Sequence, residues 1–199
     1  KDYYGAIADY TKAIELDPSY DKAYLNRGAS KSELKDYYGA IADFNKAIEL
    51  DPSYDKAYLN RGFSKSELKD YYGAIEDFNK AIELNSNYTK AYYNRGISKY
   101  YLNDFNGAIE DHDKAIELDP NFALSYKNRA TSKFMLKDYY GAIADFTKAI
   151  ELDPNNADVY YDRGISKSRL RDYSGTCQDA RKAQSLGYDA SKLIKLVCN

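Results

Sequence analysis

Polar side chains that could recognise a peptide recur along the chain at a constant interval. An amide side chain both donates and accepts hydrogen bonds, as a peptide backbone does, and an ammonium group attracts a carboxylate. Asparagines follow one another every 34 residues, at Asn26, Asn60, Asn94 and Asn128. Lysines stand four residues before the first three, at Lys22, Lys56 and Lys90. This alternation favours binding of an extended or acidic protein segment.

Residues that catalyse reactions or bind metals form no comparable group. His112 is the only histidine, and it replaces the aromatic residue of the column Phe44, Phe78 and Phe146, so we predict a core position. A lone histidine favours neither a metal site nor a nucleophile pair. The recurring glutamates read as solvated helix-end residues: Glu15, Glu49, Glu83, Glu117 and Glu151. We therefore predict that the chain is not an enzyme and has no cofactor or metal site.

Cys177 and Cys198 are the only cysteines, too few for a disulfide scaffold or a structural zinc site. Two interpretations stay open. A disulfide would pin the C-terminal helix and indicate a periplasmic or extracellular location, whereas two reduced thiols would be small hydrophobic groups in a cytoplasmic protein. The compartment therefore stays unknown.

Composition restricts the class of partner. The chain has 29 basic and 31 acidic residues, a formal net charge of -2, and lacks the basic excess typical of nucleic-acid binding. No apolar run approaches the roughly 18 residues that a transmembrane helix needs. With 23 tyrosines and no tryptophan, the chain is rich in amphipathic aromatic side chains. We expect a protein or peptide partner, no nucleic acid and no direct membrane insertion.

A repeat of 34 residues organises the whole chain, because arginines recur at Arg27, Arg61, Arg95, Arg129 and Arg163. Each unit contains two stretches with helical spacing of apolar residues. The first two units differ at only five of 34 positions. We predict one array consisting of a half unit at 1–20, full units at 21–54, 55–88, 89–122, 123–156 and 157–190, and a capping helix ending in 191–199.

Unit boundaries contain residues that stop and start helices. Prolines that end the preceding helix are Pro18, Pro52, Pro120 and Pro154. The predicted N-cap residues of the following helices are Ser19, Ser53, Asn87, Asn121, Asn155 and Asp189. A glycine column falls in the first turn of each second helix, at Gly5, Gly39, Gly73, Gly107, Gly141 and Gly175. We attribute these glycines to close approach of the adjoining repeat.

The arginine column has predicted partners on the second helices, at Asp9, Asp43, Asp77, Asp111, Asp145 and Asp179. We expect pairs of the Arg27–Asp43 type, within a unit or across to a neighbour. Such a pair would satisfy the guanidinium, and a buried half-pair would cost several kcal/mol.

These residues resemble the tetratricopeptide repeat (TPR) family. Its pattern of a large aromatic, Gly, Ala, an aromatic, Ala and Pro is met by Tyr24, Gly28, Ala40, Phe44, Ala47 and Pro52. Departures are Arg27 and Lys31, where the pattern usually has Leu and an aromatic, and Ala130, Thr176 and Ala180 at Gly, Ala and Phe columns. The resemblance implies an all-α solenoid, a right-handed superhelix of antiparallel helix pairs, with a C-terminal capping helix.

The resemblance also implies a concave groove lined by the first helices, which is the expected binding site. The predicted peptide-binding residues are Lys22, Leu25, Asn26, Lys56, Leu59, Asn60, Phe63, Lys90, Tyr93, Asn94, Ile97 and Asn128. Part of this set is similar to the clamp with which TPR co-chaperones grip acidic chaperone tails, but Leu25, Leu59, Ala29, Phe63 and Asp162 occupy its other polar positions. The alternative is that these residues are solvated positions copied with the repeat.

Further along the predicted groove, apolar side chains replace the Ser-Glu of the first two units, at Tyr100, Tyr101, Phe134 and Met135. They form either a second apolar patch for a ligand or a cover over neighbouring helices.

We predict that the chain is a protein–protein interaction scaffold that binds an extended segment in the groove. One alternative is a self-assembling structural module, because the half unit at 1–20 lacks its first helix and exposes an apolar face. In the intact protein we expect further repeats upstream of this half unit. Another is the regulatory or targeting part of a larger enzyme.

Overall fold

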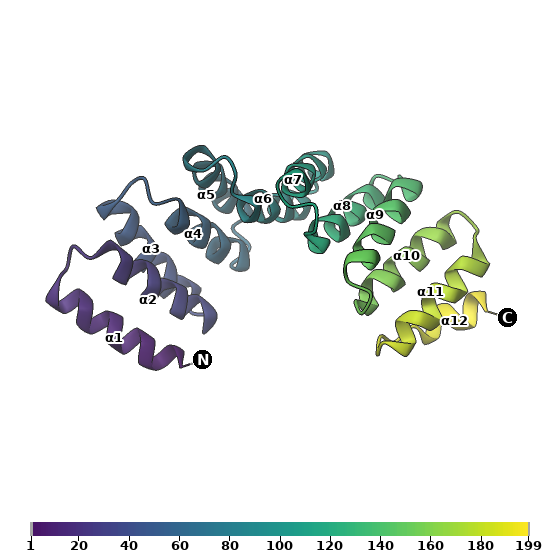
Figure 1. The fold of residues 1–199 in the computed structure, drawn as a ribbon, viewed down its shortest axis with the longest axis horizontal. Helices are drawn as coiled ribbons and strands as arrows, with labels where there is room; N and C mark the ends of the chain where they lie inside the picture. Colours follow the sequence, from purple (N-terminus) through teal and green to yellow (C-terminus); the bar gives the residue numbers. More distant parts are fainter. Residues whose placement is uncertain (1, 199) are drawn as a thin grey trace. The chain divides into compact units, whose positions relative to one another are not determined.

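The computed structural model describes residues 2–198, and every regular element in that stretch is an α-helix (Figure 1). The chain divides into two compact units, and the boundary between them, after Leu102, falls inside the predicted repeat 89–122. The first unit contains α1 Tyr3–Leu16, α2 Asp21–Glu33, α3 Tyr37–Leu50, α4 Asp55–Glu67, α5 Tyr71–Leu84 and α6 Thr89–Tyr101. The second contains α7 Phe105–Leu118, α8 Ala123–Met135, α9 Tyr139–Leu152, α10 Ala157–Arg169, α11 Tyr173–Ser185 and α12 Ser191–Val197. The predicted all-α fold is confirmed.

The core of each repeat lies where small residues let two helices approach. Phe44 and Ala40 on α3 are fully buried, in a cluster that also includes Leu25 of α2 and Ala57 of α4. A Cβ atom on Gly28 would lie 2.7 Å from the Phe44 ring, closer than carbon atoms pack. Because each cluster spans three consecutive helices, a repeat is stable only when stacked on its neighbour.

Buried ion triads join the two helices of a repeat. The carboxylate of Asp43 is bonded by Arg27 Nε and Nη2 at 3.0 and 2.7 Å, and Lys31 Nζ lies 2.8 Å from its Oδ2. The same arrangement recurs at Arg61–Asp77–Lys65, Arg129–Asp145–Lys133 and Arg163–Asp179–Lys167. These four pairs confirm the prediction and place it within a repeat. They also explain why Arg and Lys replace the apolar residues of the family pattern.

The turn from first to second helix is a Schellman motif without glycine. Lys35 has a φ of 63°, Lys35 N–H donates to Ser32 O, and Asp36 N–H donates to Lys31 O, both at 2.9 Å. The other residues with positive φ at this place are Lys69, Asn103, Lys137 and Arg171. A side chain in this conformation costs roughly 1–2 kcal/mol, so the hydrogen bonds of the motif must offset it.

The predicted N-cap column is wrong by one residue. The first helices begin after Tyr20, Tyr54, Tyr88, Phe122 and Asn156, none of which forms a side-chain cap hydrogen bond. Ser53 instead lies in the preceding turn, where its N–H and hydroxyl both donate to Asp51 Oδ1, at 2.9 and 2.6 Å. The ring of Tyr54 packs against the core cluster, which accounts for an aromatic residue at the cap.

The glycine column is explained by capping and not by the adjoining repeat, so that interpretation was wrong. Each second helix begins with an aspartate N-cap; Gly39 N–H donates to Asp36 Oδ1 at 2.9 Å. A Cβ atom on Gly39 would overlap the Asp36 carboxylate. The same pair recurs at Asp2–Gly5, Asp70–Gly73, Asp104–Gly107, Asp138–Gly141 and Asp172–Gly175.

His112 is fully buried on α7, as predicted for a core residue. Burial is the largest influence on its imidazole and lowers its pKa from 6.5 to about 4.

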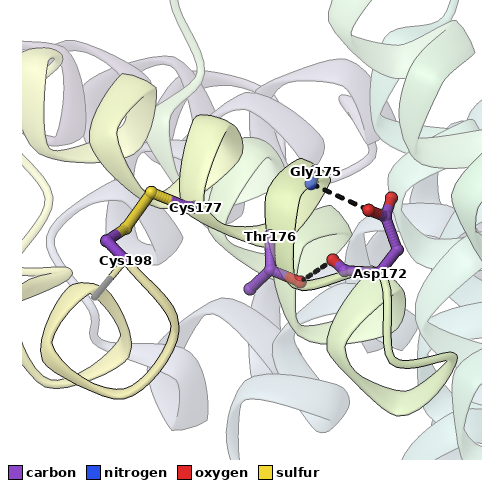
Figure 2. The surroundings of a disulfide bond; sticks show 5 residues. All are labelled: Asp172, Gly175, Thr176, Cys177 and Cys198. Atoms are coloured by element: carbon purple, nitrogen blue, oxygen red, sulfur yellow. Dashed lines mark hydrogen bonds between the residues drawn. A yellow bond between two sulfur atoms is a disulfide. The ribbon is translucent and has the colours of Figure 1, made fainter.

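The C-terminal helix α12 packs on α11, with Leu193 buried against Ala180 and Ala183. Just past α12, Cys198 is joined by a disulfide to Cys177 on α11, with 5.2 Å between their Cα atoms (Figure 2). Beside Cys177, the Thr176 hydroxyl donates to Asp172 O at 2.7 Å, which ties this part of α11 to its own first turn (Figure 2). The terminal helix is therefore fixed by packing and by a covalent bond.

Candidate peptide-binding groove

The predicted binding residues all lie on first helices. Those on α2, α4 and α6 belong to the first unit, whereas Asn128 lies on α8 in the second. Because the repeat length is constant, equivalent side chains occupy equivalent places on successive first helices. Contacts between α2 and α4 and between α4 and α6 make these three helices neighbours in one surface.

A surface pocket with a volume of about 510 Å³ lies between α4 and α6. From the predicted set it gathers Lys56, Leu59, Asn60, Phe63, Lys90 and Asn94. Its other lining residues are Asn87, Tyr88 and Thr89, which precede or open α6. The prediction missed these three because it followed one face of each first helix from the lysine position, Lys90 on α6, and not the residues just before it.

Charge and polarity are unevenly distributed around this pocket. Lys56 and Lys90 are exposed at the N-terminal ends of their helices, one on each side. Asn60 and Asn94, one turn further along, are half-buried. Two ammonium groups can attract a carboxylate here, and the two amides can hydrogen-bond an extended backbone.

The two leucines of the predicted set are mostly buried. Leu25 and Leu59 are each 6% exposed and belong to the hydrophobic clusters beneath the surface. They lie between the core face and the groove face of their helices, so sequence spacing alone could not assign them to either. Leu59 forms part of the pocket floor, whereas Phe63, 40% exposed, presents its ring to solvent.

A smaller pocket, between α2 and α4, places Ala29, Ser32 and Glu33 beside Asn60 and Phe63. Lys22 and Asn26 are exposed on α2, but neither lines this pocket. The structure thus brings half of the predicted residues into one pocket, and the other predicted residues of the first unit lie elsewhere on its first helices.

The asparagine column of the first helices does not continue onto α10 of the second unit. Asp162 on α10 occupies the place of the asparagine column, and burial raises its pKa to about 6, with Asp158 adding to the effect and Lys127 opposing it. Lys127 Nζ lies 3.6 Å from Asp158 Oδ2. This surface differs in charge from the pocket between α4 and α6.

Within residues 2–198, no group of three or more His, Cys, Asp or Glu side chains is arranged to hold a metal ion. In the same stretch, no helix has both the length and the apolar character needed to cross a membrane.

Comparison with known proteins identifies the family. A tetratricopeptide repeat model matches residues 21–54, 55–88, 89–122 and 123–156, and two further TPR models match residues 1–35 and 146–178. The chain belongs to the TPR family. TPR proteins are protein–protein interaction modules, and this scaffold fold is typically non-enzymatic.

Solved TPR structures resemble this chain over most of its length. YrrB, described as a TPR protein with an unusual peptide-binding site, is 24% identical, with 94% of this chain and 96% of that chain covered and a TM-score of 0.77. MamA is 27% identical over 79% of this chain and 92% of that chain, with a TM-score of 0.73. A TPR protein from Parabacteroides merdae is 26% identical over 99% of this chain and 78% of that chain, with a TM-score of 0.69. No curated protein sequence matches this TPR chain.

Proposed function

We propose that this TPR array binds an extended, acidic protein segment in the groove between α4 and α6. The observation that supports this most strongly is the pocket in which Lys56, Asn60, Lys90 and Asn94 come together from two repeats. The two lysines bind a carboxylate of the segment, and the two asparagines bond its backbone. Phe63 provides an apolar contact beside them.

Binding is tested by fluorescence anisotropy with extended peptides that differ only in carrying Asp or Asn. The variant Lys56→Ala/Lys90→Ala should weaken binding of the acidic peptide roughly five- to thirtyfold, because each exposed ion pair contributes up to about 1 kcal/mol. Raising the salt concentration should reduce the preference for Asp, because screening weakens exposed ion pairs.

The matched control is Lys46→Ala/Lys80→Ala, which removes the same charge from partly exposed lysines that pair with Glu49 and Glu83 on the second helices. Equal losses in both variants would mean that net charge, and not this pocket, attracts the peptide. Equal affinities for the Asp and the Asn peptide would contradict a carboxylate site.

A second candidate function is self-association through α1. None of its residues is buried, although Ala40, at the place equivalent to Ala6, is fully buried on α3. Asp9 is exposed, whereas Asp43 and Asp77 are 4% and 3% exposed in their ion triads. An apolar face with an exposed carboxylate can pair with another copy.

Sedimentation velocity over a range of concentrations tests this second function. If α1 forms the interface, Ala6→Glu should abolish the larger species. Ala8→Glu is the control, because Ala8 is exposed and glutamate occurs naturally at the equivalent Glu76. Association that survives Ala6→Glu places the contact elsewhere.

A further inference from the structure

We infer that the groove between α4 and α6 has a second subsite, at the C-terminal ends of these helices, for an apolar side chain of the same bound segment. This inference rests on the proposed function and specifies its ligand. It starts from two matching stripes of residues. Steps of four, three and four residues place Lys56, Asn60, Phe63 and Glu67 along one face of α4, and Lys90, Asn94, Ile97 and Tyr101 along one face of α6.

Pockets show that the two stripes face the same groove. The pocket at the N-terminal ends is lined by the first three residues of the α4 stripe and the first two of the α6 stripe. A second pocket, of about 450 Å³, is lined by Ser66, Glu67, Lys69, Tyr71, Ile97 and Tyr101. Since the stripes match in register in both pockets, a ligand can lie along the groove and reach both.

An aromatic stack forms one wall of the second pocket. The rings of Tyr71 and Tyr101 stack with centroids 4.9 Å apart and an interplanar angle of 10°. Tyr101 is nevertheless 58% exposed, so much of its ring surface is open to a ligand. Ile97 lies one turn before Tyr101 and adds an aliphatic surface.

This wall is a local change in the repeat. At the equivalent places of the preceding repeats, the Tyr3 hydroxyl donates to Glu33 Oε2 at 2.9 Å and the Tyr37 hydroxyl to Glu67 Oε2 at 3.0 Å. Tyr101 replaces that glutamate, and the hydrogen-bonded bridge becomes an aromatic stack. The first two units differ at few positions, so this substitution is among the features that distinguish the third.

The character of the second pocket points to a neutral apolar side chain. Its walls are the two tyrosine rings and Ile97, and its rim has one negative and one positive side chain, Glu67 and Lys69. The rim charges offset each other, so neither an acidic nor a basic group gains from entering. Burying an aliphatic or aromatic side chain against these walls is favourable in proportion to the area removed from water.

The length of the groove fixes the spacing in the ligand. Lys56 and Glu67 are eleven residues apart on α4, which corresponds to about 16 Å along the helix. An extended peptide advances roughly 3.3 Å per residue, so about five residues separate the two subsites. The ligand is thus a segment with an acidic residue and an apolar residue about five positions apart.

A peptide array tests this spacing on the full chain. Each peptide has one Asp and one Leu in a Gly-Ser background, at separations from two to eight and in both orders, with Leu→Ser and Asp→Asn partners. Binding should be strongest near a separation of five, and Leu→Ser should weaken it about tenfold there, as expected for partial loss of a buried leucine.

The matched variant is Tyr101→Glu, because glutamate is the natural residue at the equivalent Glu33 and Glu67. It should abolish the preference for Leu over Ser and leave the preference for Asp over Asn unchanged. Lys56→Ala/Lys90→Ala should do the opposite. Circular dichroism checks that both variants fold. If Tyr101→Glu lowers stability, Ile97→Ala replaces it as the test variant, because it keeps the tyrosine stack and should also reduce the preference for Leu over Ser.

The outcomes separate the two hypotheses. The second subsite is overturned if peptides with Asp bind better than those with Asn but the affinity does not change with Leu→Ser, with the position of the leucine or with Tyr101→Glu. The proposed function would then remain in place. Leucine-dependent binding without any preference for Asp contradicts the carboxylate site instead. If no peptide of the array binds, both are overturned.

Discussion

Arg61 donates two hydrogen bonds to the buried carboxylate of Asp77, from Nε at 2.9 Å and from Nη2 at 2.5 Å. Its remaining nitrogen, Nη1, donates to Asn45 Oδ1 of the preceding repeat at 2.7 Å, and the guanidinium lies over the ring of Tyr58. One side chain therefore joins the two helices of its own repeat and also connects that repeat to the one before it.

Removing Asp77 should be far more costly than removing Asp9. Asp77→Ala leaves Arg61 and Lys65 without their shared carboxylate in a mostly buried place, and we expect a loss of about 3–5 kcal/mol in the free energy of unfolding. Asp9→Ala is the control, since Asp9 is exposed, and should cost less than about 1 kcal/mol. Urea denaturation measures both, and similar losses would show that the buried triad is not a main source of stability.

The glycine of the second helix should show strong coupling to its cap. Asp70→Ala removes the hydrogen bond from Gly73 N–H and should cost about 1 kcal/mol. Once Asp70 is absent, Gly73→Ala should stabilise the protein by about 1 kcal/mol, because alanine is the better helix former. When Asp70 is present, Gly73→Ala displaces the Asp70 carboxylate, and the loss of this cap offsets the stabilisation by alanine.

Thermal denaturation of the two single variants and the double variant gives the coupling energy. Additive effects would contradict the capping explanation. Gly62→Ala provides a comparison, because its Cβ atom would meet the Phe78 ring whatever residue stands at position 70.

The fold could be predicted because the 34-residue period repeats the same core residues in register. The arginine–aspartate pairs could also be predicted, since Arg61 and Asp77 keep their separation in every unit, whereas the lysine that completes each triad was not predicted. The cap positions were not, because the Ser53 column is only one residue from the true N-cap and its side chain serves the preceding turn. The turn at Lys69 was equally hidden, since a left-handed residue is usually revealed by glycine.

The candidate site was predicted in part. Lys56 and Asn60 follow from helical spacing, but Leu59 lies at the edge between core and groove, where only packing decides. Tyr101 was recognised as one of four apolar side chains, and its stack with Tyr71 depends on the distance between neighbouring repeats. Sequence spacing within one helix contains no information about that distance.

The disulfide gives a direct prediction about the C-terminal helix. Cys177 and Cys198 are 21 residues apart, and a cross-link over a loop of this size typically contributes about 3 kcal/mol. Cys177→Ser/Cys198→Ser should lower the unfolding free energy by about that amount, and hydrogen exchange should show α12 opening first. Dithiothreitol should have the same effect on the native chain and none on the variant. A native protein that alkylates at both cysteines without reduction would show that the bond does not form.

The buried imidazole of His112 should make stability depend on pH. Burial holds its pKa at about 4 in the folded chain; Arg129 also lowers it, while Asp111 and Asp113 oppose the shift. The unfolded chain has the ordinary pKa of about 6.5, so between these values it binds more protons than the folded chain. The stabilisation is therefore complete above about pH 6.5 and is lost as the pH falls to about 4, a change of roughly 3 kcal/mol.

His112→Phe isolates this contribution, because phenylalanine occupies the same place at Phe44, Phe78 and Phe146. The native chain should lose stability relative to the variant as the pH falls from 6.5 to 4, and the difference between them should stay constant from pH 7 to 8. Urea denaturation at each pH supplies the comparison, and subtracting the two curves removes the titration of the carboxylates that both proteins share. Parallel curves over the whole range would show that the pKa of His112 is the same in the folded and the unfolded chain, and would contradict this prediction.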